Sequence, residues 1–288
     1  MRFPARSFLS VCLVAVCASL ATAQSPQPSP SPQATDPQAA ALLARSAAAL
    51  RGNAPLSDVT LTGTARRIAG SDDESGQVTI KARATGQTRL DLNLPSGKHS
   101  ESRNVSPAAG PNVGAGFSPS SSVAITAPSG QWTGPDGAAH DIAYHNLIAE
   151  PAWHSPAILL AQLLANPNLV VANLGQETRN GAAVQHLSIA QTATGTSDTD
   201  RLMQHLSQLD LYLDPATLLP ASVAFNIHPD NNANLDIPVE IRFSDYRSVN
   251  GVKVPFRLER FFNGSLSLDI QLDSATLNSG LSASDFSL

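Results

Sequence analysis

The chain has 288 residues, and its 18 lysines and arginines stand against 23 aspartates and glutamates, which gives a net charge of −5. Charged residues make up 14% of the sequence, below the roughly 25% that is usual in a soluble domain, and 42% of the residues are hydrophobic. This apolar content is enough for a packed core and argues against disorder of the whole chain. Because no basic cluster is present, the sequence does not indicate nucleic-acid binding.

The first 23 residues are typical of a secretory signal peptide. Two arginines precede an apolar run over residues 8–20, and small residues at 21–23 provide a cleavage site. The run is shorter than the roughly 20 residues that cross a bilayer, so we expect export and no membrane span after cleavage. Both cysteines, Cys12 and Cys17, lie in this segment. The mature domain would therefore hold no disulfide.

A linker and a helix are expected next. Residues 24–36 are rich in Pro, Ser and Gln, a composition that favours extended, solvated chain. Asp36-Pro37 then supplies an N-cap and a first-turn proline, apolar residues recur at helical spacing, and Gly52 ends the pattern. We predict a disordered linker over 24–36 and a helix over 37–51, where the folded domain, residues 37–288, begins.

From residue 58 the apolar residues alternate with polar ones, which predicts half-buried antiparallel strands around 59–62, 78–81 and 90–94. The acidic stretch 71–76 is interpreted as the turn between the first two strands. Residues 106–130 are rich in Pro, Gly, Ser and Ala and are predicted to be a long insertion, either a lid or disordered chain. A Gly-Pro-Asp-Gly turn follows at 134–137.

The second half of the chain predicts one helix and several hairpins. Ser155-Pro156 opens a strongly apolar helix over 155–165, too short to cross a bilayer. Asn-Gly pairs at 180, 250 and 263 lie between strand-like runs, and this dipeptide is a strong signal for a tight hairpin. The resulting sheet has one polar and one apolar face. Two helices cannot cover that apolar face closely, so the sheet must curl and can leave a cavity.

Three motifs resemble those of the outer-membrane lipoprotein carrier (LolA-like) superfamily. Leu211–Pro215, followed by Leu219-Pro220, is similar to the family's strand and turn L-x-L-D-P-x-T-x-L-P. Asp245–Phe256 is similar to its hairpin D-Y-x-x-V-x-G-V-x-x-P-F, and Asp285-Phe286 is similar to its D-x-x-F ending. The match is good over residues 205–288. Upstream it rests on the order of the elements and on the export signal.

The resemblance implies an α+β fold in which a curved, unclosed antiparallel β-barrel of about ten strands carries helices on its concave face. It also implies an exported, periplasmic binding module, without catalysis or cofactor, that holds a lipid or the acyl chain of a lipoprotein. The periplasm would be that of a Gram-negative bacterium, and otherwise the protein would be secreted. The residues expected to line the cavity are Leu90, Leu92, Leu159, Leu163, Phe225, Phe243, Phe256 and Leu268.

Two alternatives stay open at this stage. One is a structural or sensory envelope domain of the same fold, with a filled core and a protein partner. The other is a hydrolase or metal site on His140, His145 and His154, which lie within 15 residues together with Asp141 and Glu150. Their spacing places these side chains on no common face of a helix, so ordinary loop histidines remain the simpler interpretation.

Overall fold

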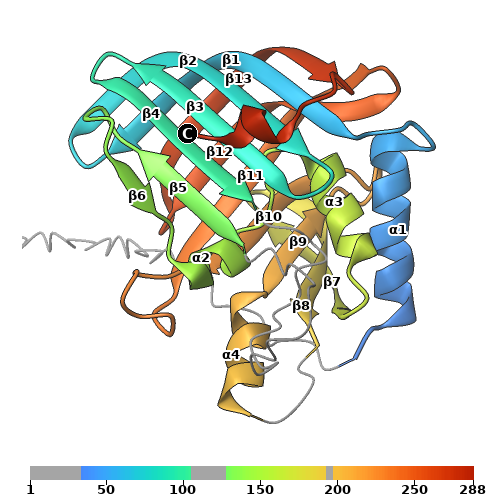
Figure 1. Cartoon of the computed structure of the whole chain (residues 1–288). Helices are drawn as coiled ribbons and strands as arrows, with labels where there is room; N and C mark the ends of the chain where they lie inside the picture. Colours follow the sequence, from blue (N-terminus) through green and yellow to red (C-terminus); the bar gives the residue numbers. More distant parts are fainter. Residues whose placement is uncertain (1–33, 105–127, 193–196) are drawn as a thin grey trace, which may run out of the picture.

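The computed structural model describes residues 34–104, 128–192 and 197–288 (Figure 1). The expected signal peptide over 1–23 lies outside the described residues, as do most of the expected linker and most of the expected insertion. The insertion ends earlier than expected, because Ser129 and Gly130 already belong to a strand.

The described chain forms one antiparallel sheet of 13 strands in the order β6-β5-β4-β3-β2-β1-β13-β12-β11-β10-β9-β8-β7. The strands are β1 Asp58–Ala69, β2 Asp72–Arg83, β3 Gln87–Leu94, β4 Gly97–Asn104, β5 Ser129–Thr133, β6 Ala139–Asp141, β7 Leu169–Arg179, β8 Ala182–Gln191, β9 Leu209–Leu213, β10 Pro220–Ile227, β11 Ile237–Val249, β12 Val252–Phe262 and β13 Ser265–Leu277. The edge strands β6 and β7 do not pair with each other, so the barrel is open. This confirms the predicted α+β half-barrel, with more strands than expected.

All three Asn-Gly pairs lie at hairpin turns, as predicted. The asparagine φ angles are 51° at Asn180, 46° at Asn250 and 47° at Asn263, and each following glycine is also at positive φ. Two successive residues at positive φ give the turn whose twist matches the twist of the flanking strands. These turns set the registers of β7 with β8, β11 with β12 and β12 with β13.

Both helices predicted from the sequence are present, and both pack against the sheet. Helix α1 (Pro37–Arg51) begins at Asp36, whose side chain accepts a hydrogen bond from the Gln38 N–H, and it ends at Gly52. Helix α3 (Pro156–Ala165) begins after Ser155. The two helices contact each other and β12, and in Figure 1 they lie opposite β5 and β6. Their apolar faces join the inward-facing residues of the strands in one core.

Three short elements were not predicted: α2 (Tyr144–Ala149), α4 (Asp198–Leu206) and a 3-10 helix over Ala283–Phe286. The acidic stretch 71–76 also differs from its interpretation as a turn. The turn is only two residues long, and Asp72 opens β2. Asp73 lies in that strand, and its side chain forms an ion pair with Arg66 of the neighbouring β1.

The motifs that carry the family resemblance are structural. Asp214 closes a turn by accepting hydrogen bonds from the Ala216 and Thr217 N–H groups. The Tyr246 hydroxyl donates to the carbonyl oxygen of Pro220 at 2.8 Å, so the second motif is bonded to the first. Burial raises the pKa of Tyr246 well above its usual value, which keeps this hydroxyl protonated.

Candidate binding cavities on the concave face

The concave face is built by residues that alternate along the strands. On β3 and β4 the cross-strand pairs Leu92 with His99, Leu90 with Glu101, and Thr88 with Arg103 share one face. On the other side of the curve, Leu268 of β13 lies between Arg67 of β1 and Arg260 of β12. The apolar face is therefore interrupted by charged side chains, a detail that the alternation pattern alone did not predict.

A cavity of about 590 Å³, here called the wide cavity, lies on the concave face of the sheet. Residues of β3, β4 and β5 line one side of it, and residues of β1, β12 and β13 line the other. Its apolar lining comes from Ile68, Leu90, Leu92, Trp132, Leu266 and Leu268. Phe262 also lines it. Trp132 is 44% exposed and Phe262 is 39% exposed, so two aromatic side chains remain accessible to solvent at this cavity. A volume of this size falls within the range of roughly 300–1,000 Å³ that is usual for small-molecule sites.

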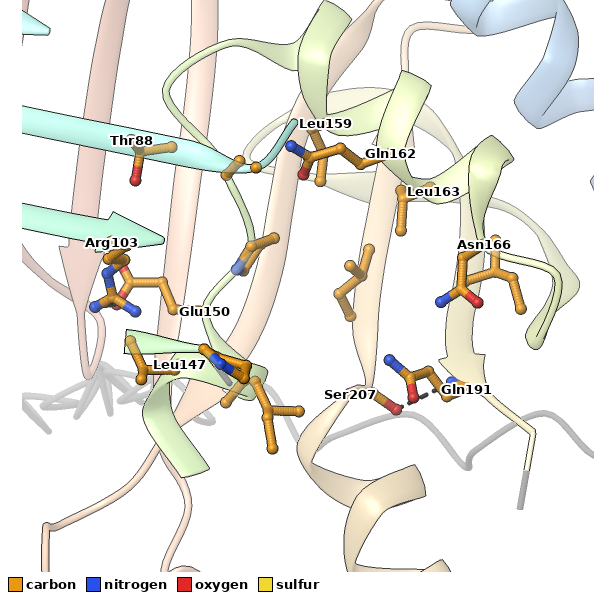
Figure 2. A pocket seen from close by; sticks show the side chains of 18 of the residues that line it. Thr88, Arg103, Leu147, Glu150, Leu159, Gln162, Leu163, Asn166, Gln191 and Ser207 are labelled. Atoms are coloured by element: carbon orange, nitrogen blue, oxygen red, sulfur yellow. Dashed lines mark hydrogen bonds and ion pairs between the residues drawn. The ribbon is translucent and has the colours of Figure 1, made fainter. Parts of the chain in front are cut away.

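A second cavity, the narrow cavity, lies between the start of β3, the end of β4 and helices α2, α3 and α4. Figure 2 shows its lining side chains, among them Thr88, Gln162, Leu163 and Gln191. The Gln191 N–H donates to the Ser207 hydroxyl. The narrow cavity has a volume of about 140 Å³, which is smaller than the volume of usual ligand sites and suits a few water molecules.

A buried ion-pair network connects the walls of the two cavities. Arg103 donates from Nη2 to Glu150 Oε2 and from Nε to Glu101 Oε1, both at 2.6 Å. Trp153 Nε1 donates to Glu150 Oε1 at 2.8 Å, and Arg260 Nη2 lies 3.6 Å from the same oxygen. Glu101 and Arg260 line the wide cavity, whereas Arg103 and Glu150 line the narrow one. The network therefore forms a polar partition between them.

The charges of this partition are fixed by their neighbours. Burial opposes ionisation of Glu150, but Arg103 and Arg260 outweigh it and hold the pKa of the carboxyl below its usual range. Burial, assisted by the same two arginines, lowers the pKa of His154 to about 3. His154 is therefore neutral at neutral pH, and its ring stacks on Trp153 with the centroids 3.9 Å apart.

The residues expected to line one cavity are distributed over three places. Leu90, Leu92 and Leu268 line the wide cavity, and Leu159 and Leu163 line the narrow one. The phenylalanines lie in the packed core of the half-barrel, where they are at most 6% exposed: Phe225, Phe243 and Phe256. Strand alternation predicts which face a residue occupies, but not whether that part of the face is packed or open.

The structure does not assemble the histidine site on His140, His145 and His154 among the described residues. His140 is exposed on β6 and stacks on Trp132. His145 lies on α2 with its Nε2 3.1 Å from the Pro229 carbonyl oxygen, and His154 is buried against Trp153. Of the acidic residues near them in sequence, Asp141 accepts a hydrogen bond from Gln131. Closeness in sequence did not predict closeness in space, because the three histidines lie on different elements: a strand, a helix and a loop.

Sequence reasoning missed Arg103, Arg260 and the role of Glu150. Arg103 and Arg260 belong to strands far apart in the chain, and Glu150 follows the short helix α2. The sequence does carry one signal: Arg103 and Arg260 occupy inward-facing positions, where an unpaired charge would be costly. A buried acidic partner could have been anticipated from this, although its identity could not.

No family model matches the sequence, and no curated protein matches it. Solved structures do match. A domain described as an outer membrane lipoprotein-sorting protein from Vibrio parahaemolyticus superposes with a TM-score of 0.54 at 12% identity, covering 86% of this chain and 96% of that one. A DUF1329 family protein from Desulfovibrio piger gives 0.54 at 12% identity, covering 88% and 98%. A LolA superfamily protein from Nitrosomonas europaea gives 0.47 at 10% identity, covering 87% and 97%.

The first two similarities concern the backbone over nearly the whole of each chain, at an identity that bears on fold and not on chemistry. Among the described residues, no helix has the length and apolar character needed to span a membrane. The turn motifs predicted a half-barrel, and both the strand order and these two backbone similarities agree with that prediction. The chain has the fold of the lipoprotein-sorting domain and the DUF1329 protein.

Proposed function

We propose that this chain is an exported, periplasmic binding module that holds the acyl chain of a lipid or lipoprotein in its wide cavity. The observation that carries the proposal is the cavity itself: about 590 Å³ on the concave face, with leucines on both walls and two exposed aromatic side chains. Two solvent-exposed aromatics beside an apolar cavity favour a ligand with an apolar body. No catalytic step is part of the proposal.

Burial of apolar surface provides the driving force. Each buried CH₂ group contributes about 0.8 kcal/mol, so a segment of about ten carbons would contribute about 8 kcal/mol before the cost of ordering is subtracted. The loss of translational and rotational freedom costs about 4 kcal/mol or more, which leaves at most about 4 kcal/mol, or about millimolar affinity, from these ten carbons. A longer acyl chain and polar contacts to its head group would have to supply tighter binding.

Polar atoms inside the cavity suit the other end of such a ligand. Arg260 Nε and His99 Nε2 are buried and have no hydrogen-bond partner in the described part of the chain. Arg67 also lines the cavity. A carboxylate or ester oxygen would supply the missing acceptor for the Arg260 Nε–H and lie close to a cation. The proposed ligand is therefore an amphiphile with an oxygen-bearing head group.

The experiment is a titration of the full chain with a fluorescent fatty acid. We expect one probe to bind per chain, and Leu90→Trp, which fills the cavity from a half-buried position, to weaken binding at least tenfold. The matched control is Leu174→Trp, because Leu174 is exposed on β7 and lines neither cavity. Circular dichroism of each variant verifies folding, and Leu266→Trp repeats the test from β13. Absence of binding, or equal binding by all variants, would overturn the proposal.

A further inference from the structure

A second group of polar side chains lies away from the partition. His205 is in the last turn of α4, His228 directly follows β10, and Asp236 directly precedes β11. Strands β10 and β11 are antiparallel neighbours that pair Ile227 with Ile237, so their connection brings residues 228 and 236 together. Helix α4 then places His205 beside them.

The distances suit a common metal ion. His205 Nε2 lies 2.9 Å from Asp236 Oδ1, and His228 Nδ1 lies 3.5 Å from the same oxygen. One ligand atom from each residue lies within 4.8 Å of the other two. Two ligands of a tetrahedral zinc ion, each bonded at about 2.05 Å, are about 3.3 Å apart, which is close to both distances. An ion at His228 Nδ1 would replace the contact of that atom with the Leu235 carbonyl oxygen.

The surroundings hold His228 in position and leave it incompletely bonded. Its side chain is 1% exposed, Nδ1 lies 3.2 Å from the Leu235 carbonyl oxygen, and Nε2 has no hydrogen-bond partner among the described residues. The Asn146 side chain donates to the His228 carbonyl oxygen and accepts from the His228 N–H, which ties this backbone to α2. His205 and Asp236 are partly exposed, so an ion could reach the group from solvent.

We propose that His205, His228 and Asp236 bind a divalent first-row transition cation of the Zn²⁺ class. Two imidazoles and one carboxylate are a donor set that such ions prefer, and three protein ligands leave a fourth position for water. The inference is independent of the acyl-binding proposal. The ion would join α4 to the β10–β11 connection, and because Met203 and Ser207 line the narrow cavity, it would hold one wall of that cavity in place.

The test is calorimetric titration of the full chain with ZnCl₂ in a buffer free of chelator. We expect one Zn²⁺ per chain, and at least tenfold weaker binding for His205→Gln and for Asp236→Asn. Both positions are partly exposed, so these variants should fold, which circular dichroism checks. His140→Gln is the matched control, since His140 is exposed and lies outside the group, and its affinity should equal that of the wild type.

Cobalt substitution provides a second readout. Co²⁺ bound to the wild-type chain should show the visible absorption of a tetrahedral site, and His205→Gln should lose it. Absence of zinc binding by the wild type would overturn the proposal, as would unchanged affinity in both His205→Gln and Asp236→Asn. Loss of binding in the control would assign the ion to other histidines and overturn the proposal equally.

Discussion

The two cavities on the concave face use the same strands for different purposes. The wide cavity is bordered by leucines from β3 and β13, whereas the narrow cavity is lined by α2, α3 and α4 and includes Arg103 and Glu150. The difference arises from where the helices lie, because three helices line the narrow cavity, whereas strands and one turn line the wide cavity. An unclosed barrel can thus keep a packed core and a large cavity in a single sheet.

Among the variants that test this comparison, Glu150→Gln should have the largest effect, a loss of stability. The variant leaves the buried Arg103 without the carboxylate that follows α2, so that Glu101, which is partly exposed, is its remaining ion-pair partner. Removal of one member of a buried ion pair typically costs about 3 kcal/mol or more, so we expect a large fall in the free energy of unfolding measured in urea. Asp73→Asn, which removes an exposed pair with Arg66, is the control and should leave stability unchanged. Equal stability of both variants would mean that the partition does not stabilise the fold.

His154 gives the partition a pH dependence. Its pKa is lowered to about 3 in the folded chain, against about 6.5 unfolded, so its stabilising effect is complete above pH 6.5 and is lost as the pH falls toward 3. Between pH 6.5 and 5.0 the loss should be about 2 kcal/mol, at 1.36 kcal/mol per unit. His154→Gln should remove that part of the slope in urea titrations at several pH values. An identical slope in both proteins would show that His154 does not remain neutral.

The smallest expected effect is that of Gln162→Trp on fatty-acid affinity, and it tests which of the two cavities binds the probe. Gln162→Trp places a large side chain in the narrow cavity, on the half-buried part of α3. We expect the affinity for the fluorescent fatty acid to stay within twofold of the wild type, since that cavity is too small for an acyl chain. Fluorescence titrations of Gln162→Trp and Leu90→Trp, done in parallel, compare the probe affinities of the two variants. A strong loss in Gln162→Trp alone would place the probe in the narrow cavity.

Local signals predicted much of the fold. Asn180-Gly181 and Asn250-Gly251 determine their turns through their own backbone preferences, and Asp36 and Gly52 bound α1 through local hydrogen bonds. Helix α4 was missed although Ser197 and Asp200 form a capping box, because only nine residues follow with few apolar positions. The 3-10 helix near the C-terminus was missed for the same reason, because it has only four residues.

The sites could not be predicted to the same extent, because they depend on contacts between distant segments. The pairing of Arg103 with Glu150 needs the end of β4 to meet the end of α2. The group of His205, His228 and Asp236 needs α4 to lie on the β10–β11 connection. Sequence spacing instead suggested His140, His145 and His154, which the fold separates. Residue type indicated the chemistry in each case, but the fold decided which residues meet.

The most direct test of acyl binding is a crystal structure of the full chain grown with dodecanoic acid. We expect electron density for the acyl chain in the wide cavity, between Leu92 of β3 and Leu268 of β13, with its carboxylate toward Arg260. Density only in the narrow cavity, or a wide cavity filled by the protein's own side chains, would contradict the account.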